Sequence, residues 1–167
     1  MDEEIDHGPI IAQESLTIEA DDKRPNLEKK LTDLGFEMFK KLIKKHNNSC
    51  SAVSKLSLSK QNHKLATYTK KLTKQDGFIE VSKLKDQILK NSKELFNLFR
   101  GLTPWPGIWT MVKPVQLRQL DEVKRLKITG LNIVRNKNLC SLRIKRVQLE
   151  GKKEVDFETF NKAYKIF

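Results

Sequence analysis

FRGLTPWPG (residues 99–107) separates a helical pattern from a β pattern. Pro104 and Pro106 cannot continue a helix, and the two glycines of the stretch permit tight turns. Apolar residues recur at helical spacing before the stretch, at Leu84, Ile88, Leu95 and Phe99. The sequence therefore predicts a helix from about residue 82 to residue 100, followed by an ordered corner.

Two β segments are predicted after the corner, Arg125–Val134 and Leu139–Leu149. The apolar positions change parity once in each segment, at Gly130 in the first and across Lys145-Arg146 in the second. Such a change predicts a β-bulge, and strongly bent, bulged strands are typical of a small barrel.

Local patterns predict further elements before residue 65 and near the C-terminus. Partial alternation over Ile10–Ile18 predicts a strand. An amphipathic helix is predicted next, because apolar residues recur on one face at Leu27, Leu31, Leu34, Met38 and Leu42. From His46 to about Lys64, serines and asparagines interrupt the periodicity, which predicts a linker. Near the C-terminus, Val155–Tyr164 predicts a short helix with Asp156 as its N-cap.

The balance of charge changes shortly before the predicted linker. The 167 residues carry a net charge of +12. Residues 1–40 hold 11 acidic and 5 basic residues, a net charge of −6, whereas residues 41–167 hold 28 basic and 10 acidic residues, a net charge of +18. A basic body suits a polyanionic partner such as a nucleic acid, although a lysine-rich surface also serves solubility.

Membrane, secreted and metal-dependent classes are disfavoured. No stretch approaches the roughly 20 apolar residues of a membrane-spanning helix, and the acidic Asp2 and Glu3 argue against a signal peptide. Cys50 and Cys140 imply no disulfide framework, so we expect two reduced thiols in a cytoplasmic protein. The three histidines lack metal-ligand spacing, and no metal is expected.

Three separated blocks of the sequence point to one family. Residues 5–13 (IDHGPIIAQ) are similar to the aspartate-containing segment of formyltetrahydrofolate-dependent transferases. Residues 99–107 are close to an R-A/G-L/F-N-P-W-P-G corner, with Thr103 in place of the usual Asn. Residues 147–153 (VQLEGKK) are similar to a late strand and turn. Together the blocks resemble the C-terminal portion of methionyl-tRNA formyltransferase, over nearly the whole chain.

The resemblance implies an α/β chain in three parts. Residues 1–45 would end a Rossmann-like formyltransferase catalytic domain, residues 46–65 would form a linker, and residues 66–167 would form a mainly β, OB-like barrel with flanking helices. It also implies formyl transfer from 10-formyltetrahydrofolate to initiator methionyl-tRNA, which the barrel would hold. We expect a monomer without membrane association. Either the chain is a fragment of the enzyme or a second chain supplies the N-terminal part.

Catalysis in this family uses an Asn, a His and an Asp. The Asn and the His stabilise the developing oxyanion, while the Asp orients the His and helps to move protons. Asp6 matches the catalytic Asp, and the resemblance places Glu4 and Asp6 at the folate. His7 stands at the motif's usual Thr or Ala position, so it is not the catalytic His. The five residues before Asp6 supply neither missing group, so we expect the 167 residues alone to be inactive.

Contacts with tRNA are expected on the outer faces of the β segments. Basic residues alternate there with apolar ones or follow in the next turn, at Arg125, Lys127, Arg143, Lys145, Lys152 and Lys153. Such residues suit phosphate contacts, which position RNA without reading its sequence. Ordinary solvated charges are the alternative for each residue. Trp105 and Trp109 could stack on bases, but burial at the corner is the favoured interpretation.

Two other functions stay open. The first is a non-catalytic RNA-binding module, in which the first 45 residues are vestigial. The second is a formyltransferase that uses another acceptor, such as a sugar nucleotide, or hydrolyses formyl-folate. Those relatives share the aspartate motif, but the P-W-P-G corner and the basic β region favour the tRNA enzyme.

Overall fold

The structure is a computed structural model that describes residues 4–47, 58–90, 92–113, 123–136 and 139–166. By its internal contacts the chain divides into two units, Met1–Lys71 and Leu72–Phe167. Cys50 and half of the predicted linker, residues 48–57, lie outside the described residues. The division into three parts stays a prediction.

The main element of the first unit is helix α1 (Arg24–Asn47), which confirms the helix predicted from apolar spacing. Just before it, the buried carboxylate of Asp22 accepts hydrogen bonds from the backbone N–H of Glu19 (2.9 Å) and from Lys30 Nζ (2.8 Å). The bond to Asp22 raises the pKa of the Lys30 ammonium above its ordinary value. The chain is therefore fixed against the first turns of α1.

The predicted strand over Ile10–Ile18 is wrong. Ile10 forms an isolated two-bond bridge with Ser59, with N···O distances of 2.9 and 3.0 Å, and residues 11–18 form no ladder. A strand persists where a neighbour satisfies its backbone groups, and the described part of this unit holds no second strand to do so. The Rossmann-like layer therefore stays a prediction.

No apolar core is present among the described residues of the first unit. Every buried hydrophobic side chain that the structure describes belongs to the second unit. Helix α1 instead exposes large apolar side chains, including Phe36 (59% exposed) and Phe39 (57% exposed). Apolar surface of this kind on a helix is typical of an element that packs against another protein surface.

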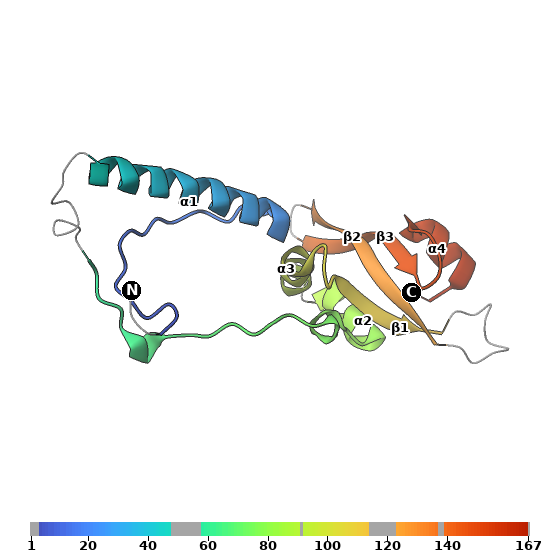
Figure 1. The fold of residues 1–167 in the computed structure, drawn as a ribbon. Helices are drawn as coiled ribbons and strands as arrows, with labels where there is room; N and C mark the ends of the chain where they lie inside the picture. Colours follow the sequence, from blue (N-terminus) through green and yellow to red (C-terminus); the bar gives the residue numbers. More distant parts are fainter. Residues whose placement is uncertain (1–3, 48–57, 91, 114–122, 137–138, 167) are drawn as a thin grey trace. The chain divides into compact units, whose positions relative to one another are not determined.

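The second unit is built on an antiparallel sheet in the order β1-β2-β3-β4, and Figure 1 labels its first three strands. The strands are β1 (Ile108–Val112), β2 (Lys124–Asn136), β3 (Leu139–Leu149) and β4 (Val155–Asp156). β2 and β3 confirm the two predicted β segments, whereas β1 and β4 have no counterpart in the sequence-based prediction. This four-stranded sheet does not establish a closed OB-like barrel, which stays a prediction.

Both predicted parity changes occur where the β2–β3 register shifts. Gly130 lies opposite Arg146, and the ladder passes over Thr129 on β2 and Lys145 on β3. The strands approach closely here, since a Cβ added to Gly130 would lie 3.1 Å from the Cβ of Arg146. A glycine at this position therefore lets β2 bend without a clash.

Three α-helices accompany the sheet: α2 (Val81–Lys90), α3 (Ser92–Leu102) and α4 (Phe157–Tyr164). The single helix predicted from about 82 to 100 is thus wrong, because two helices in contact take its place. Apolar residues spaced by 4, 7 and 4 positions fit one long helix as well as two short ones. The predicted cap of α4 is confirmed, since the Asp156 carboxylate accepts from the Glu158 N–H (2.9 Å).

All three helices contribute to one apolar cluster with the sheet. Its fully buried members come from strands and helices alike and include Ile108, Leu126, Ile128, Val147, Leu84, Leu95, Phe99 and Phe160. Because these alternate strand residues point to the helices, the residues between them point to the opposite, outer face of the sheet.

The predicted corner joins α3 to β1. Thr103 donates twice to the carbonyl O of Phe99, from its backbone N (3.1 Å) and its Oγ1 (2.6 Å). The Gly107 N–H donates to the carbonyl O of Leu102 (2.8 Å), and Gly107 has a left-handed backbone (φ +70°). These bonds lead the chain directly from the helix into the strand.

A short 3-10 helix, η3 (Lys74–Gly77), approaches the corner from the other side. A Cβ added to Gly77 would lie well inside contact distance of the Gly107 carbonyl O. η3 therefore lies directly against the corner, and this approach brings Lys74 to the outer face of the sheet.

Candidate nucleic-acid interface

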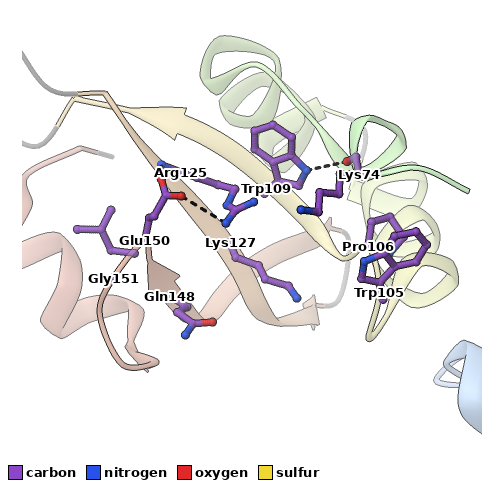
Figure 2. Close-up of a pocket in the computed structure, with 10 residues that line it drawn as sticks. Lys74, Trp105, Pro106, Trp109, Arg125, Lys127, Gln148, Glu150 and Gly151 are labelled. Carbon is purple, nitrogen blue, oxygen red and sulfur yellow. Dashed lines mark hydrogen bonds and ion pairs between the residues drawn. The ribbon is translucent and has the colours of Figure 1, made fainter.

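A hollow lies between the outer face of the sheet and the corner (Figure 2). Its volume is about 320 Å³, and its lining combines two tryptophans, three cationic side chains and one carboxylate. We call it the corner hollow; its lining residues are Lys74, Trp105, Pro106, Trp109, Arg125, Lys127, Gln148, Leu149, Glu150 and Gly151.

The two tryptophans form different walls of the corner hollow. Trp105 stands between two cis prolines, Pro104 and Pro106, and 45% of its surface is exposed. Trp109 is half-buried on β1, and its Nε1–H donates to the carbonyl O of Lys74 (2.9 Å). The expected burial is therefore wrong for Trp105, whereas its neighbour Pro106 is buried.

Two predicted contact residues, Arg125 and Lys127, line the corner hollow from β2 (Figure 2). The Arg125 guanidinium lies 3.4 Å from Glu150 Oε1 and 6.0 Å from the centroid of the Trp109 ring. Lys127 Nζ donates to the carbonyl O of Pro104 (3.3 Å), at the foot of the corner. Two contacts thus fix Arg125 in the wall, while the Lys127 ammonium lies beside the corner backbone.

The other four predicted contact residues lie outside the corner hollow. All four are exposed, on β3 or in the turn after it, at Arg143, Lys145, Lys152 and Lys153. Gly151 shapes that turn with a left-handed backbone (φ +74°). These residues add cationic surface to the second unit, but the structure does not gather them with Arg125 and Lys127 into one site.

Lys74 and Gln148 are lining residues that the sequence analysis missed. Lys74 begins η3, far from β2 in the sequence, and no local pattern singles it out. Gln148 pairs with Lys127 across the β2–β3 ladder, and its Nε2 donates to the carbonyl O of Lys152 (3.2 Å). The strand alternation that marks Lys127 as outward also marks Gln148, but an uncharged side chain draws less attention.

In the first unit, Asp6 lies in an exposed turn with a left-handed backbone (φ +59°). Aspartate tolerates this conformation better than most residues do. The amide of Gln61 bonds the turn: its Nε2 donates to the carbonyl O of Asp6 (2.9 Å) and to that of Gly8 (2.6 Å). One side chain therefore binds both carbonyls that flank His7.

Further contacts join the same two segments. The rings of His7 and His63 stack with centroids 3.8 Å apart, where the 3-10 helix η2 (His63–Leu65) begins. Together with Gln61 and the Ile10–Ser59 bridge, the stack connects residues 6–10 to residues 59–63. We call this set of contacts the Asp6 clamp. Residues 59–63 belong to the predicted linker, so part of that segment makes specific contacts with residues 6–10.

Glu4, the other predicted folate contact, is exposed in a bend two residues before Asp6. The family resemblance requires an Asn and a His beside Asp6 as oxyanion donors. The described residues include no match to either of them. Nor do they include a cluster of three or more His, Cys, Asp or Glu side chains that could hold a metal ion. Among the described helices, none is long and apolar enough to cross a membrane.

Comparison with known proteins identifies the family. Residues 71–165 match the model of the C-terminal domain of formyl transferases. The chain belongs to the formyl transferase family. The matched segment coincides almost completely with the second unit, which begins at Leu72. The resemblance seen at the P-W-P-G corner is thereby confirmed.

The chain is similar to several proteins named methionyl-tRNA formyltransferase. The protein from Caldicellulosiruptor saccharolyticus is 29% identical over 180 residues, which cover 99% of this chain and 53% of the relative. Identity is 31% with the protein from Campylobacter jejuni subsp. doylei, over 96% of this chain and 50% of the relative. The protein from Kosmotoga olearia is 32% identical, over 81% of this chain and 37% of the relative. The chain spans about half the length, or less, of these relatives.

Proposed function

We propose that the chain acts as the C-terminal portion of a methionyl-tRNA formyltransferase, in which the second unit binds tRNA. The supporting observation is the position of the corner hollow, within the segment that matches the formyl transferase C-terminal domain. Cationic and aromatic side chains converge there on the P-W-P-G corner. That combination suits an RNA ligand, which offers phosphates to the cations and bases to the aromatic rings.

Charge supplies most of the proposed affinity. The net charge of +18 on residues 41–167 attracts a polyanion over a distance. Arg143, Lys145, Lys152 and Lys153 are exposed and contact phosphates outside the corner hollow, as Lys127 does inside it. Such contacts hold the tRNA without reading its sequence.

The first unit contributes Asp6 to formyl transfer in this proposal. The methionyl amine attacks the formyl carbon of 10-formyltetrahydrofolate, the bond from that carbon to N10 breaks, and tetrahydrofolate leaves. The Asp6 carboxylate takes part in moving the amine proton to the leaving nitrogen, while Glu4 and Asp6 face the folate. Asp6 is the one member of the family's Asn, His and Asp set that these 167 residues match. The oxyanion donors therefore come from a further catalytic part, on the same or another polypeptide, which covers the exposed apolar side chains of α1.

A formylation assay tests this proposal. The 167 residues alone should give no formyl-methionyl-tRNA above background, since loss of a single oxyanion donor costs about 10²–10³ in rate. Joined to the catalytic part of a relative, the chain should become active, and Asp6→Asn should then lower turnover by about 10²-fold or more. Asp21→Asn, at an exposed aspartate of the same unit, is the matched control.

Two results would contradict the proposal. One is full activity of the 167 residues by themselves. The other is an active joined enzyme in which Asp6→Asn turns over as fast as the control variant.

A non-catalytic RNA-binding module is the second candidate. The observation that favours it is the confinement of the described apolar core to the second unit, which leaves the first without a core of its own. This candidate predicts unchanged tRNA binding together with no activity when the catalytic part is supplied. The assay above therefore separates the two functions.

A further inference from the structure

We propose that the corner hollow binds one unpaired nucleotide of the RNA, with its base stacked on Trp105 and its phosphate at Lys127 and Lys74. This inference rests on the proposed RNA binding and adds the form of the ligand. A helical RNA backbone needs cations on an open surface, whereas an exposed indole in a concave site suits a base that has left its stack.

The first observation concerns the aromatic platform. Trp105 exposes 45% of its surface at the mouth of the corner hollow, although its neighbour Pro106 is buried. The flanking prolines and the hydrogen-bonded turn from Leu102 to Gly107 fix the backbone on both sides of the ring. The ring is therefore held ready for stacking, and little backbone freedom is lost when a base binds.

The second observation concerns the cations beside the ring. Lys127 lies against the corner backbone, since a Cβ added to Gly107 would be 2.6 Å from Lys127 Cε. Its ammonium donates to the Pro104 carbonyl O (3.3 Å), one residue before Trp105. The Lys74 side chain reaches the same space from η3 (Figure 2). Two ammonium groups line the same hollow as the Trp105 ring, and a nucleotide offers a phosphate to the cations and a base to the ring.

Arg125 has a different part. Its contacts with Glu150 (3.4 Å) and with the Trp109 ring (6.0 Å to the centroid) hold it in the wall. The Trp109 Nε1–H donates to the carbonyl O of Lys74, so we assign its ring to the wall of the corner hollow as well. Trp105 is thus the aromatic residue of the pair that we assign to base stacking.

The third observation concerns size and polarity. A volume of about 320 Å³ lies at the lower end of the roughly 300–1,000 Å³ of small-ligand sites. The Gln148 side chain lines the hollow and offers amide groups to the edge of a base. The corner hollow therefore fits a single nucleotide and is too small for a duplex.

Binding measurements with three RNAs test the inference: tRNA, a short oligouridylate, and a blunt-ended duplex without unpaired nucleotides. Trp105→Ala should weaken tRNA and oligouridylate binding by about 5- to 100-fold, the usual effect of removing one stacking ring. Trp105→Phe should restore most of the affinity. Duplex binding should not change. Tyr68→Ala, which removes another exposed aromatic ring, is the matched control.

Salt dependence separates the two roles within the corner hollow. Lys127→Ala should lower the slope of log K against log [salt] for tRNA by about 0.7–0.9, the value of one phosphate contact. Trp105→Ala should leave that slope unchanged, because stacking releases no counterions.

The outcomes distinguish this inference from the proposed function. If Trp105→Ala binds tRNA as tightly as the unaltered chain, the nucleotide site is refuted and RNA binding stands. An equal loss of duplex and single-strand affinity also refutes stacking. If the unaltered chain binds none of the three RNAs, both the inference and the proposed RNA binding fail. Selective loss with rescue by phenylalanine supports the nucleotide site.

Discussion

Gly77 and Gly107 meet where η3 lies against the corner, and the lack of a side chain at residue 77 permits that approach. A Cβ on residue 77 would run into the Gly107 carbonyl O, which belongs to backbone held by its own hydrogen bond. The neighbouring residue Lys74 lines the corner hollow, so the same contact also sets the shape of the candidate RNA site.

Gly77→Ala should therefore destabilise the second unit by about 1–3 kcal/mol, the usual cost of an overpacked contact. Thermal unfolding followed by circular dichroism measures the change. Gly101→Ala is the control, because a Cβ there meets nothing within 4 Å. That substitution in α3 should be neutral or stabilising by up to about 1 kcal/mol. Equal stability of the two variants would argue against the close approach of η3 to the corner.

Local signals in the sequence are enough for some single residues. Asp156 precedes a helical pattern and caps α4, and Gly130 stands where apolar parity changes and permits the bend. Residues whose partners are distant could not be found in this way. Lys74 and Gln61 make contacts with segments that are distant in the sequence. No local pattern beside either residue predicts those contacts.

At the scale of elements, the Asp6 clamp includes only Ile10 of the strand that the sequence predicts. Residues 59–63 bind the Asp6 turn through Gln61, the histidine stack and the Ile10–Ser59 bridge. A polar segment with few apolar residues looks like a linker by composition. The side-chain amide of Gln61 in this segment nevertheless donates to carbonyls more than fifty residues away in the sequence.

Gln61→Ala should open the Asp6 clamp, because two hydrogen bonds from one amide group are lost. Each such bond contributes about 0.5–1.5 kcal/mol, so amide exchange at Ile10 and Ser59 should speed up by about 5- to 150-fold. Exchange measured by NMR at these two residues reports the change. Gln61→Glu should behave in the same way, since a carboxylate cannot donate, and Gln13→Ala is an exposed control. Unchanged exchange in both Gln61 variants would remove Gln61 from the clamp.

Periodicity predicted the long elements better than the short ones. α1, β2 and β3 each repeat their pattern over ten or more residues, so their existence follows from the sequence. β1 has five residues directly after the corner, and its identity depends on pairing with β2. The spacing of apolar residues likewise does not distinguish α2 and α3 from one long helix.

At the scale of the whole molecule, the described apolar core and the proposed catalytic residue Asp6 belong to different units. The second unit holds the described apolar core, whereas the first exposes the apolar side chains of α1 and holds Asp6. Hydrophobic burial is the dominant favourable contribution to folding. The two units should therefore differ in their ability to fold alone.

Residues 72–167 alone should unfold in one cooperative transition, at a temperature within about 3 °C of the full chain. A change of 1 kcal/mol shifts the midpoint of a domain of this size by about 4–8 °C, and no described core contact is lost with the first unit. Calorimetry of the full chain and of this segment makes the comparison. Loss of the transition, or a fall of more than about 8 °C, would show that the first unit contributes to the core.

The charge of the second unit supports the central claim, that it binds tRNA through phosphate contacts. The most direct measurement is the salt dependence of tRNA affinity for the unaltered chain and two variants. The first variant carries alanine at Arg143, Lys145, Lys152 and Lys153. The second carries alanine at four exposed lysines of α1, Lys29, Lys41, Lys44 and Lys45, and has the same net charge.

The unaltered chain should lose affinity steeply as salt rises. The first variant should flatten the slope of log K against log [salt] by about 2–4, since each phosphate contact contributes about 0.7–0.9. The α1 variant should keep the slope of the unaltered chain. Identical slopes for the two variants would remove these four residues from the interface, and a tRNA affinity independent of salt would contradict binding through phosphates altogether.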